Sequence, residues 1–331
     1  MFDRRMSQQS VKLYLMTPST IKFTKENIFQ MVVEGINLNQ PLQKGKIKLF
    51  LKKQNLEFFE KANKYLNALY TVANKKLNYT PDKFVNSYVD FCKMILRESL
   101  YFKKHRSYRT EDQYKNLYYY DDKSYMYSYM CGLGISQFLW PNHHKMWSFF
   151  QKICVNLSKN IRNYLEVGPG HGFYLCEAIN AFMRAEIKCI DLSKTSLEIT
   201  KNMCDLLIPN FKKLQTINGN FLEIKANKND FDLIVICEVL EHLNDPISFL
   251  KHTHSLLSKN GYAIISTCAN SACVDHVYLY KSVEHIKSHI KQGNFTIEEE
   301  LALPVEDKDY TDSWYKKEVE SNYIALISKS S

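Results

Sequence analysis

The stretch Asn163-Tyr-Leu-Glu-Val-Gly-Pro-Gly-His-Gly172 constrains this chain more than any other part of it. Its first residues are typical of a short buried strand, its glycines predict a sharp turn, and a helix is expected to begin near His171. Glycine lets the backbone turn and approach a ligand closely, because no Cβ stands in the way. The N-terminus of the following helix offers free N–H groups and a partial positive charge. The stretch therefore predicts a nucleotide-binding turn.

Two common nucleotide motifs do not fit this turn. No Gly-Lys-Ser/Thr follows it, and the spacing of Gly168, Gly170 and Gly172 differs from the G-x-G-x-x-G of dinucleotide sites. With Glu166 in front, the order is Glu-x-Gly-x-Gly-x-Gly, which resembles the first motif of class I S-adenosylmethionine (SAM)-dependent methyltransferases. The resemblance implies SAM as cofactor, S-adenosylhomocysteine (SAH) as product, and cofactor contacts from Glu166, Gly168, Pro169, Gly170 and His171.

The chain from Arg162 onward alternates strands and helices, which predicts a parallel sheet with helices on both faces. The expected strands are Tyr164–Val167, Ile187–Ile190, Leu214–Ile217, Phe231–Cys237 and Gly261–Thr267. The expected helices lie near His171–Met183, Ser193–Leu207, Pro246–Leu257 and Ser282–Gln292. Two final strands, Asn294–Leu303 and Asn322–Ser328, have no full helix between them. They predict a hairpin and an antiparallel last strand, as in the Rossmann-like, doubly wound α/β fold of class I methyltransferases.

Asp191 ends the second expected strand, ~20 residues beyond the glycine turn, which is the spacing of an acid that binds both ribose hydroxyls. The alternative role is a helix N-cap at Asp191 or Ser193, and the two roles are compatible. The resemblance implies further SAM contacts. Leu192 follows the ribose acid, Asn220 accepts from the adenine amino group, and Phe221 lies against the ring. Cys237 and Glu238 lie beside the methionine part.

The segment Glu238-Val-Leu-Glu241-His242 offers a candidate metal site. Glu238, Glu241 and His242 would share one face of a helix, and His276 follows the fifth expected strand. The segment resembles that of small-RNA 3′-terminal 2′-O-methyltransferases and, more loosely, ubiquinone-pathway O-methyltransferases, which implies a divalent cation. These ligands suit Mg²⁺, Mn²⁺ or Zn²⁺, and such an ion lowers the pKa of an acceptor hydroxyl. The alternative is a packing or polar network without metal.

A histidine is the expected general base if no metal is bound. The candidates are His276, with Asp275 beside it, and His143 or His144. An imidazole whose pKa is near the working pH is well placed to take a hydroxyl proton as the methyl group arrives.

An aromatic segment, Ser124–Phe150, precedes the glycine turn and is interrupted by Gly132, Gly134 and Pro141. In class I methyltransferases this position supplies helices that close over SAM and the acceptor. We expect residues 124–160 to act as a lid, with pocket contacts from Tyr125, Tyr129, Gln137, Trp140, and His143 or His144. The alternative is that these aromatic residues pack the domain junction. With this lid included, we expect the methyltransferase domain to span residues 124–331.

Residues 1–123 carry no recognised motif and predict a mainly helical module. Apolar residues at helical spacing from Lys46 to about Lys76 predict one long amphipathic helix. Thr80 and Pro81 predict the start of a second helix, which ends near Lys103. Residues 101–122 are expected to form a polar, tyrosine-rich connector. Ser10–Phe23 has some strand-like alternation, and Lys25–Glu34 predicts a short helix.

The composition bears on the cellular compartment and on the kind of partner that this chain binds. Nine cysteines without a C-x-x-C pair and without a secretory signal fit a reducing cytoplasm. No run approaches the ~18 apolar residues that span a membrane. Residues 1–160 carry 26 Lys and Arg against 12 Asp and Glu, whereas residues 161–331 carry 18 against 23. Either the basic half binds an anionic partner, or the asymmetry reflects genomic base composition.

These features favour a SAM-dependent methyltransferase that acts on an oxygen, with nitrogen as second choice, of a small-molecule or carrier-bound acceptor in biosynthesis. A metal-dependent RNA ribose 2′-O-methyltransferase is the first alternative, although no RNA-binding motif is present. A non-catalytic SAM-binding partner subunit is the second. The aromatic segment could also form a homodimer interface.

Overall fold

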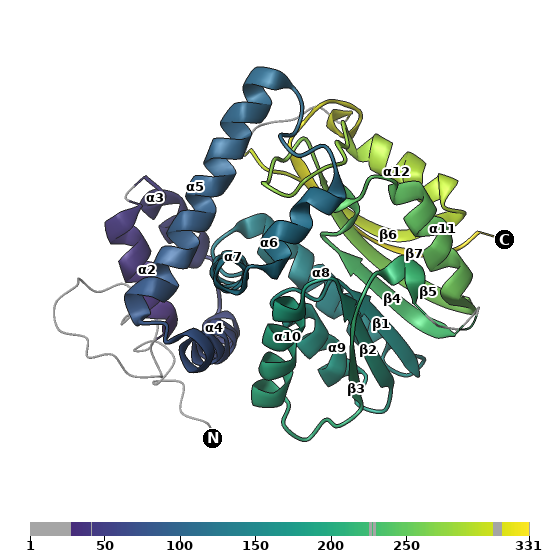
Figure 1. The fold of residues 1–331 in the computed structure, drawn as a ribbon, viewed down its shortest axis with the longest axis horizontal. Helices are drawn as coiled ribbons and strands as arrows, with labels where there is room; N and C mark the ends of the chain where they lie inside the picture. Colours follow the sequence, from purple (N-terminus) through teal and green to yellow (C-terminus); the bar gives the residue numbers. More distant parts are fainter. Residues whose placement is uncertain (1–27, 41, 225–226, 228–229, 307–312, 331) are drawn as a thin grey trace.

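The computed structural model describes residues 28–40, 42–224, 227, 230–306 and 313–330, so the alternating stretch Ser10–Phe23 lies outside the described residues. One seven-stranded sheet forms its centre, in the order β3-β2-β1-β4-β5-β7-β6 (Figure 1). The strands are β1 (Asn163–Val167), β2 (Glu186–Asp191), β3 (Leu214–Asn218), β4 (Phe231–Cys237), β5 (Leu257–Ala269), β6 (Phe295–Pro304) and β7 (Ser321–Lys329).

The sheet confirms the predicted fold class. Strands β1 to β5 pair in parallel, whereas β7 runs antiparallel to both β5 and β6. Strand β1 pairs with β2 on one side and β4 on the other, so Val167 lies opposite both Ile190 and Ile236. The strand order reverses at this point, and ligands bind such sheets at the carboxyl ends of the strands beside the reversal.

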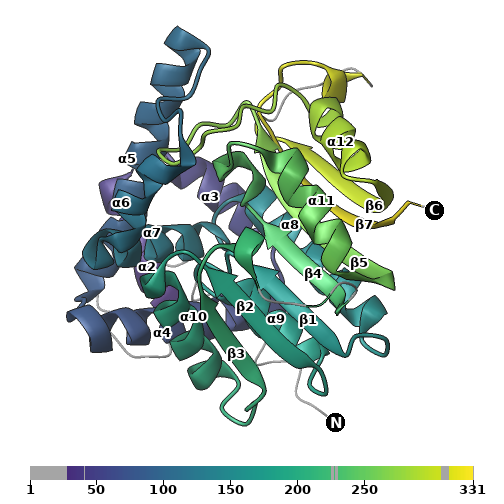
Figure 2. The ribbon, with the colours of Figure 1, turned by 45° about the vertical axis from the view of Figure 1, so that its right-hand side comes forward.

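Helices cover both faces of the sheet. Helices α9 (Phe173–Ala181) and α10 (Lys194–Leu207) share one hydrophobic cluster with α8 (Pro141–Leu157). Helices α11 (Pro246–Leu256) and α12 (Val283–Gln292) belong to a second cluster on the opposite face (Figure 2). Each predicted helix of this half begins and ends within two residues of its expected bounds.

The N-terminal half is helical, as predicted, but its first long helix is divided. The residues from 44 to 77 form α3 (Lys44–Leu51) and α4 (Leu56–Leu77). The prediction of one helix was wrong because Asn55 has an extended backbone and its side chain accepts from the amide of Phe58 at 3.0 Å. Asparagine at an N-cap favours a new helix start over continuation.

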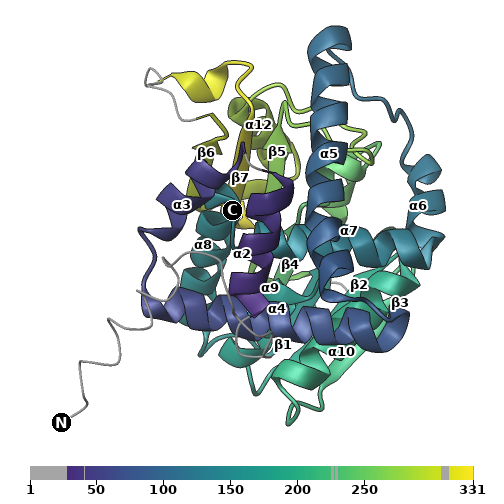
Figure 3. The ribbon, with the colours of Figure 1, turned by 90° about the vertical axis from the view of Figure 1, so that its left-hand side faces the viewer.

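The remaining N-terminal elements are α2 (Ile28–Asn39), α5 (Pro81–His105), a 3₁₀ turn η2 (Gln113–Asn116), α6 (Leu117–Asp121) and α7 (Lys123–Ser136). Helix α5 begins as predicted, because Thr80 caps it by accepting from the amide of Lys83 at 3.2 Å. Helix α4 crosses beneath α2 and α5 (Figure 3).

The helical half packs directly onto the sheet half. One hydrophobic cluster runs from Ile28 through the helices to Leu326. At its centre Trp147 is fully buried, edge-on to Tyr65 and Phe138 at ring separations of 5.2 and 5.3 Å. The Tyr65 hydroxyl donates to Glu177 at 2.6 Å. The predicted boundary between residues 123 and 124 therefore crosses a shared core.

Within the described part of the chain, no helix combines the length and apolarity that a membrane crossing requires.

Candidate active site

A cleft of about 1360 Å³ lies at the carboxyl edge of the sheet. Its walls come from the loops after β1, β2, β4 and β5 and from helices α3, α5, α7 and α8. Its volume exceeds the ~300–1,000 Å³ that usually encloses one drug-sized ligand. The cleft therefore has room for a nucleotide cofactor and a second ligand together.

The glycine turn forms the floor of this cleft. Gly168, Gly170 and Gly172 all have positive φ angles, of 67°, 57° and 79°. A Cβ on Gly168 would lie 2.8 Å from Cγ2 of Val239, so the backbone conformation and the close packing both require glycine. Pro169 and His171 also line the cleft, as predicted for cofactor contacts.

His171 is buried beside the turn and is neutral. Its Nδ1 accepts from the amide of Phe173 at 3.2 Å, so the proton resides on Nε2. Burial and the neighbouring His143 lower the pKa of His171 to about 3. The residue therefore presents an N–H donor to its surroundings over the physiological pH range.

Asp191 lies at the end of β2 and lines the cleft. Its Oδ1 accepts from the amide of Ser193 at 2.8 Å and its Oδ2 from the hydroxyl of Ser196 at 2.7 Å. Burial raises its pKa to about 6. The N-cap of α10 is Ser193, whose side chain accepts from the amide of Ser196, so the capping role belongs to Ser193. Asp191 lines the cleft, and each of its carboxylate oxygens has a second lone pair that can accept a further hydrogen bond.

Glu166 lies beneath the turn on β1 and is buried. The hydroxyl of Tyr164 donates to its Oε2. Burial raises the pKa of Glu166 to about 8, and the bond from Tyr164 only partly opposes this. The side chain is therefore largely protonated at neutral pH.

The expected adenine contacts line the opposite wall of the cleft. Asn220 caps a 3₁₀ turn, η3 (Phe221–Glu223), by accepting from the amide of Leu222 at 3.1 Å. Phe221 packs on Phe249 at a ring separation of 4.7 Å. The cleft lining on this side also contains Leu192, Asn220 and Phe221.

The segment after β4 differs from the expected helix. Glu238 has a left-handed φ of 54°, and a single 3₁₀ turn, η4 (Leu240–His242), follows. The prediction that Glu238, Glu241 and His242 share one α-helical face was therefore wrong. The Ser266 hydroxyl donates to Oε1 of Glu238 at 2.7 Å. Burial and the nearby Glu241 raise the pKa of Glu238 to about 8.

Glu241 is fully buried and joins two loops. Its Oε2 accepts from the Thr267 hydroxyl at 2.7 Å, while Oε1 is buried and accepts no hydrogen bond from the described residues. Its backbone carbonyl accepts from the amides of Val277 and Tyr278, both at 2.8 Å. These bonds hold the loop after β5 against η4.

Two histidines of this cluster have fixed tautomers. Nδ1 of His242 lies 3.0 Å from the carbonyl of Asp275, and Nδ1 of His276 lies 2.8 Å from the carbonyl of Ser271. Because a carbonyl only accepts, each Nδ1 carries a proton and each Nε2 has a free lone pair in the neutral form. Burial alone would lower the pKa of His242, but the charges of Asp275 and Glu241 outweigh burial, so the pKa is raised. Burial and His242 lower the pKa of His276.

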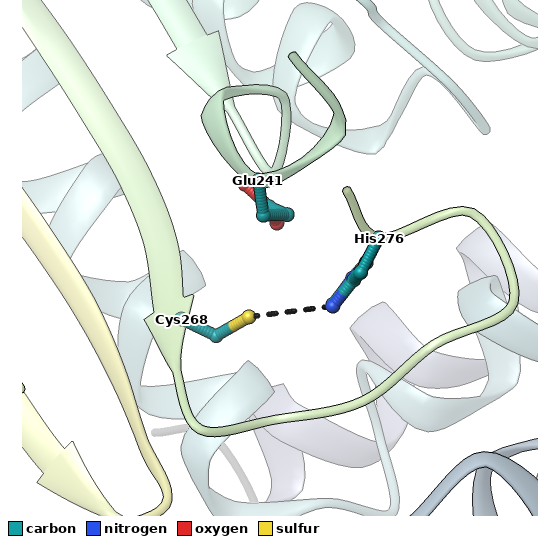
Figure 4. A group of neighbouring side chains, drawn as sticks. All are labelled: Glu241, Cys268 and His276. Atoms are coloured by element: carbon teal, nitrogen blue, oxygen red, sulfur yellow. Dashed lines mark hydrogen bonds between the residues drawn. The ribbon is translucent and has the colours of Figure 1, made fainter. Parts of the chain in front are cut away.

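Two sets of ligand-type atoms converge here, each within 4.8 Å of one another. They are Glu241 with Cys268 and His276, and His242 with Asp275 and His276. Figure 4 shows the first set, with the Cys268 sulfur directed at the His276 ring. Of the four predicted metal ligands, Glu241 and His242 each meet His276 but in different sets, Glu238 belongs to neither set, and Cys268 and Asp275 are added.

His143 occupies another part of the cleft. The Ser136 hydroxyl donates to the carbonyl of Leu133 at 2.6 Å, so Ser136 accepts from Nδ1 of His143 at 2.8 Å. Burial lowers the pKa of His143 to about 4. His143 is neutral at pH 7, with Nε2 unprotonated.

The aromatic segment contributes to the cleft in part. Tyr129, Gln137, Trp140 and His143 line it, together with Cys237 below. Two other expected residues are not among the lining residues. Tyr125 stacks on Tyr129 at 6.0 Å, and His144 packs edge-on to Phe58 at 4.9 Å within the helical half.

Sequence reasoning missed the helical half as part of this site. Tyr88 of α5 donates to Oε1 of Gln43 at 2.8 Å and accepts from Nε1 of Trp140 at 2.9 Å, and all three residues line the cleft. Tyr120 also lines it, and burial together with the charges of Asp275 and Asp191 raises its pKa. For Tyr120, the sequence signal was the density of tyrosines in residues 101–122, the stretch interpreted as a connector.

A sequence profile of the methyltransferase domain matches residues 134–314, more than half of the chain. The chain belongs to the class I SAM-dependent methyltransferase family. The profile covers the glycine turn, Asp191 and the carboxylate–histidine cluster. It also begins within the aromatic segment, at Gly134.

Curated relatives of this methyltransferase-family chain are O-methyltransferases. The chain is 31% identical to the malonyl-[acyl-carrier protein] O-methyltransferase of Halalkalibacterium halodurans over 107 residues, which are 32% of this chain and 39% of that protein. It is also 31% identical to the ubiquinone biosynthesis O-methyltransferase of Pelagibacter ubique over 137 residues, which are 41% and 53% of the two chains. The match thus spans about half or less of these relatives' own lengths.

A solved structure of similar fold is the N-methyltransferase NodS from Bradyrhizobium japonicum in complex with SAH. It is 14% identical, with a TM-score of 0.45, over 66% of this chain and 99% of that one.

Proposed function

We propose that this protein transfers a methyl group from SAM to an oxygen of a small acceptor bound in the cleft. The observation that carries the proposal is the single cleft in which the glycine turn and Asp191 adjoin a buried carboxylate–histidine cluster. The O-methyltransferase relatives support oxygen as the atom that receives the methyl group.

The transfer requires alignment more than chemical activation, because the sulfonium of SAM already activates the methyl group. The protein must hold acceptor, methyl group and sulfur in line and exclude water. In this proposal the glycine turn and Glu166 bind the methionine end, Asp191 the ribose, and Asn220 and Phe221 the adenine. Tyr120 covers the cofactor from the α6 side.

Where no cation occupies the cluster, His276 is the proposed general base. Its Nδ1–H is fixed on the Ser271 carbonyl, so Nε2 can accept a proton from an acceptor hydroxyl. Its lowered pKa keeps it unprotonated at neutral pH. His143, also neutral and in the same cleft, is the second candidate.

A divalent cation fits the donors of this cluster. Glu241, with one buried oxygen that accepts no hydrogen bond from the described residues, and the two Nε2 atoms of His242 and His276 are suitable ligands, with Asp275 beside them. When bound, such an ion would lower the pKa of the acceptor hydroxyl. The fixed Nδ1–H bonds would orient both imidazoles toward it.

The acceptor is proposed to be a biosynthetic molecule with an apolar or aromatic body, either free or attached to a carrier. Beyond the cofactor residues, the lining includes many large apolar side chains from α3, α5, α7 and the segment before α8, among them Phe50, Phe91, Met130 and Trp140, beside lysines such as Lys46 and Lys145. Such a wall favours burial of apolar surface over binding of a polyanionic backbone. The cytoplasmic location and the homodimer stay predictions.

Methyl transfer from labelled SAM into a cell extract tests the proposal. We expect label in a small, organic-soluble product that is unaffected by RNase, and no label with the Asp191→Ala variant. Label that RNase removes would replace the proposed acceptor with RNA. Loss of label on adding EDTA would support the cation. SAM binding without transfer to any acceptor would favour a non-catalytic partner subunit.

A further inference from the structure

We propose that Cys268 is a ligand of this centre and that the centre therefore takes a thiophilic, borderline cation such as Zn²⁺ or Co²⁺ in preference to Mg²⁺. This inference rests on the cation included in the proposed function. Cys268 belongs to no motif in the sequence, and only the folded structure brings it to Glu241 and His276.

The position of the thiol fits a shared ion. Cys268 is the penultimate residue of β5 and is 2% exposed. The ligand-type atoms of Glu241, Cys268 and His276 all lie within 4.8 Å of one another. Because Nδ1 of His276 donates to the Ser271 carbonyl, Nε2 is the nitrogen left to bind an ion. Two ligands of one tetrahedral zinc ion, at about 2.0–2.3 Å from it, lie roughly 3.3–3.8 Å apart. Binding of one ion would therefore draw these side-chain atoms together by up to about 1 Å.

The electrostatics also favour a cation at this place. Glu241 is fully buried beside the thiol, and among the described residues no lysine or arginine forms a salt bridge with it. A divalent ion would stabilise a thiolate and this carboxylate together.

The donor set selects among cations. Mg²⁺ prefers oxygen ligands in octahedral geometry and keeps several of its waters. A thiolate with one or two imidazoles and a carboxylate instead matches Zn²⁺ or Co²⁺. A site of oxygen and nitrogen donors alone would discriminate much less between these ions.

Cobalt binding provides a direct test on the full chain. The protein, stripped with a chelator, is titrated with CoCl₂, and a thiolate ligand gives a sulfur-to-cobalt charge-transfer band in the near ultraviolet. We expect this band in the wild type and its loss in Cys268→Ser. The Zn²⁺ affinity of the variant should fall by at least about 10- to 100-fold, which is the loss seen when a residue that only supports a metal ligand is removed. Cys131→Ser is the matched control, because that thiol is equally buried but lies on α7 and does not line the cleft. It should keep the band.

Three outcomes would overturn the inference: a band that survives in Cys268→Ser, a band lost in Cys131→Ser, or Mg²⁺ that displaces Co²⁺ at equal concentration. Circular dichroism verifies the fold of each variant, and Cys268→Ala replaces the serine variant if that one does not fold. SAM binding, measured by calorimetry without metal, separates the two proposals. If cobalt does not bind but SAM does, the thiolate centre is excluded while the methyltransferase proposal stands.

Discussion

Gln113 and Asn244 bind each other's backbone across the cleft edge. The amide of Gln113 donates to Oδ1 of Asn244 at 3.1 Å, and the amide of Asn244 donates to Oε1 of Gln113 at 2.8 Å. The Thr110 hydroxyl adds a bond to the carbonyl of Val274 at 2.7 Å. These bonds fasten residues 106–121, here called the strap, over the carboxyl ends of the strands, where Tyr120 lines the cleft.

Loosening the strap should speed cofactor release. Asn244→Ala removes both side-chain contacts of that residue to Gln113 and Asp112, and each lost bond is worth ~1 kcal/mol. We expect the Kd for SAH to rise roughly 5- to 30-fold, mainly through faster dissociation, as measured by stopped-flow fluorescence. Asn202→Ala on α10, whose side chain bonds only within its own helix, is the control. Equal dissociation rates in both variants would contradict this role of the strap.

Asp191→Asn should weaken SAM and SAH binding while preserving the fold. Asparagine keeps the shape of the side chain but loses the charge that strengthens bonds from the two ribose hydroxyls, each worth ~1.5–3 kcal/mol. We expect a loss of affinity of about 100-fold by calorimetry. Asp205→Asn, an exposed acid on α10 paired with Lys201, should bind as the wild type does. A wild-type affinity for Asp191→Asn would exclude ribose binding.

The glycine turn can be tested by two substitutions that add one methyl group. Gly168→Ala places a Cβ 2.8 Å from Val239 on a backbone with φ of 67°, a conformation that alone costs ~1–2 kcal/mol. We expect a lower Tm and weaker SAM binding. Gly219→Ala also lies at the cleft, but its Cβ would meet no atom within 4 Å. Its stability should change by less than ~0.5 kcal/mol.

The sheet half could be predicted closely because its signals are local. The apolar strand, glycine turn and strand-terminal acid each depend on a few adjacent residues, and the parallel sheet then brings Gly168, Asp191 and Cys237 to one edge. The final hairpin followed from the missing helix between the last two strands. These steps used periodicity and chain order alone.

The rest of the site depends on long-range packing, which the sequence does not encode locally. Cys268 joins Glu241 and His276 only because the β5 loop folds back onto η4. Tyr88, 78 residues before Glu166, reaches the cleft only through the docking of α5 on α7. Glu238 departs from the expected helix because its backbone is left-handed, a conformation that a non-glycine residue rarely adopts.

Helix α5 should influence binding of the acceptor and not binding of the cofactor. Tyr88→Phe removes the hydroxyl that accepts from Trp140 and donates to Gln43, leaving partly buried polar groups unpaired at ~1–3 kcal/mol. We expect the KM for the acceptor to rise several-fold while the Kd for SAM is unchanged. Tyr70→Phe, on α4 and outside the cleft, is the control. A change in SAM affinity without a change in acceptor KM would contradict the assignment of α5 to acceptor binding.

Glu166 should make the cofactor-free protein less stable as pH rises. Its pKa is about 8 in the folded chain, against ~4.3 when unfolded. The folded state therefore holds a proton that the unfolded state releases above pH ~4.3. The stability linked to it is complete below that pH and is lost, by at most ~1.4 kcal/mol per pH unit, as pH rises through 8. In Glu166→Gln this contribution is absent. In urea denaturation between pH ~5 and ~9, the stability of the variant relative to the wild type should rise with pH and level off above 8, whereas parallel curves would show that Glu166 is ionised in the folded protein.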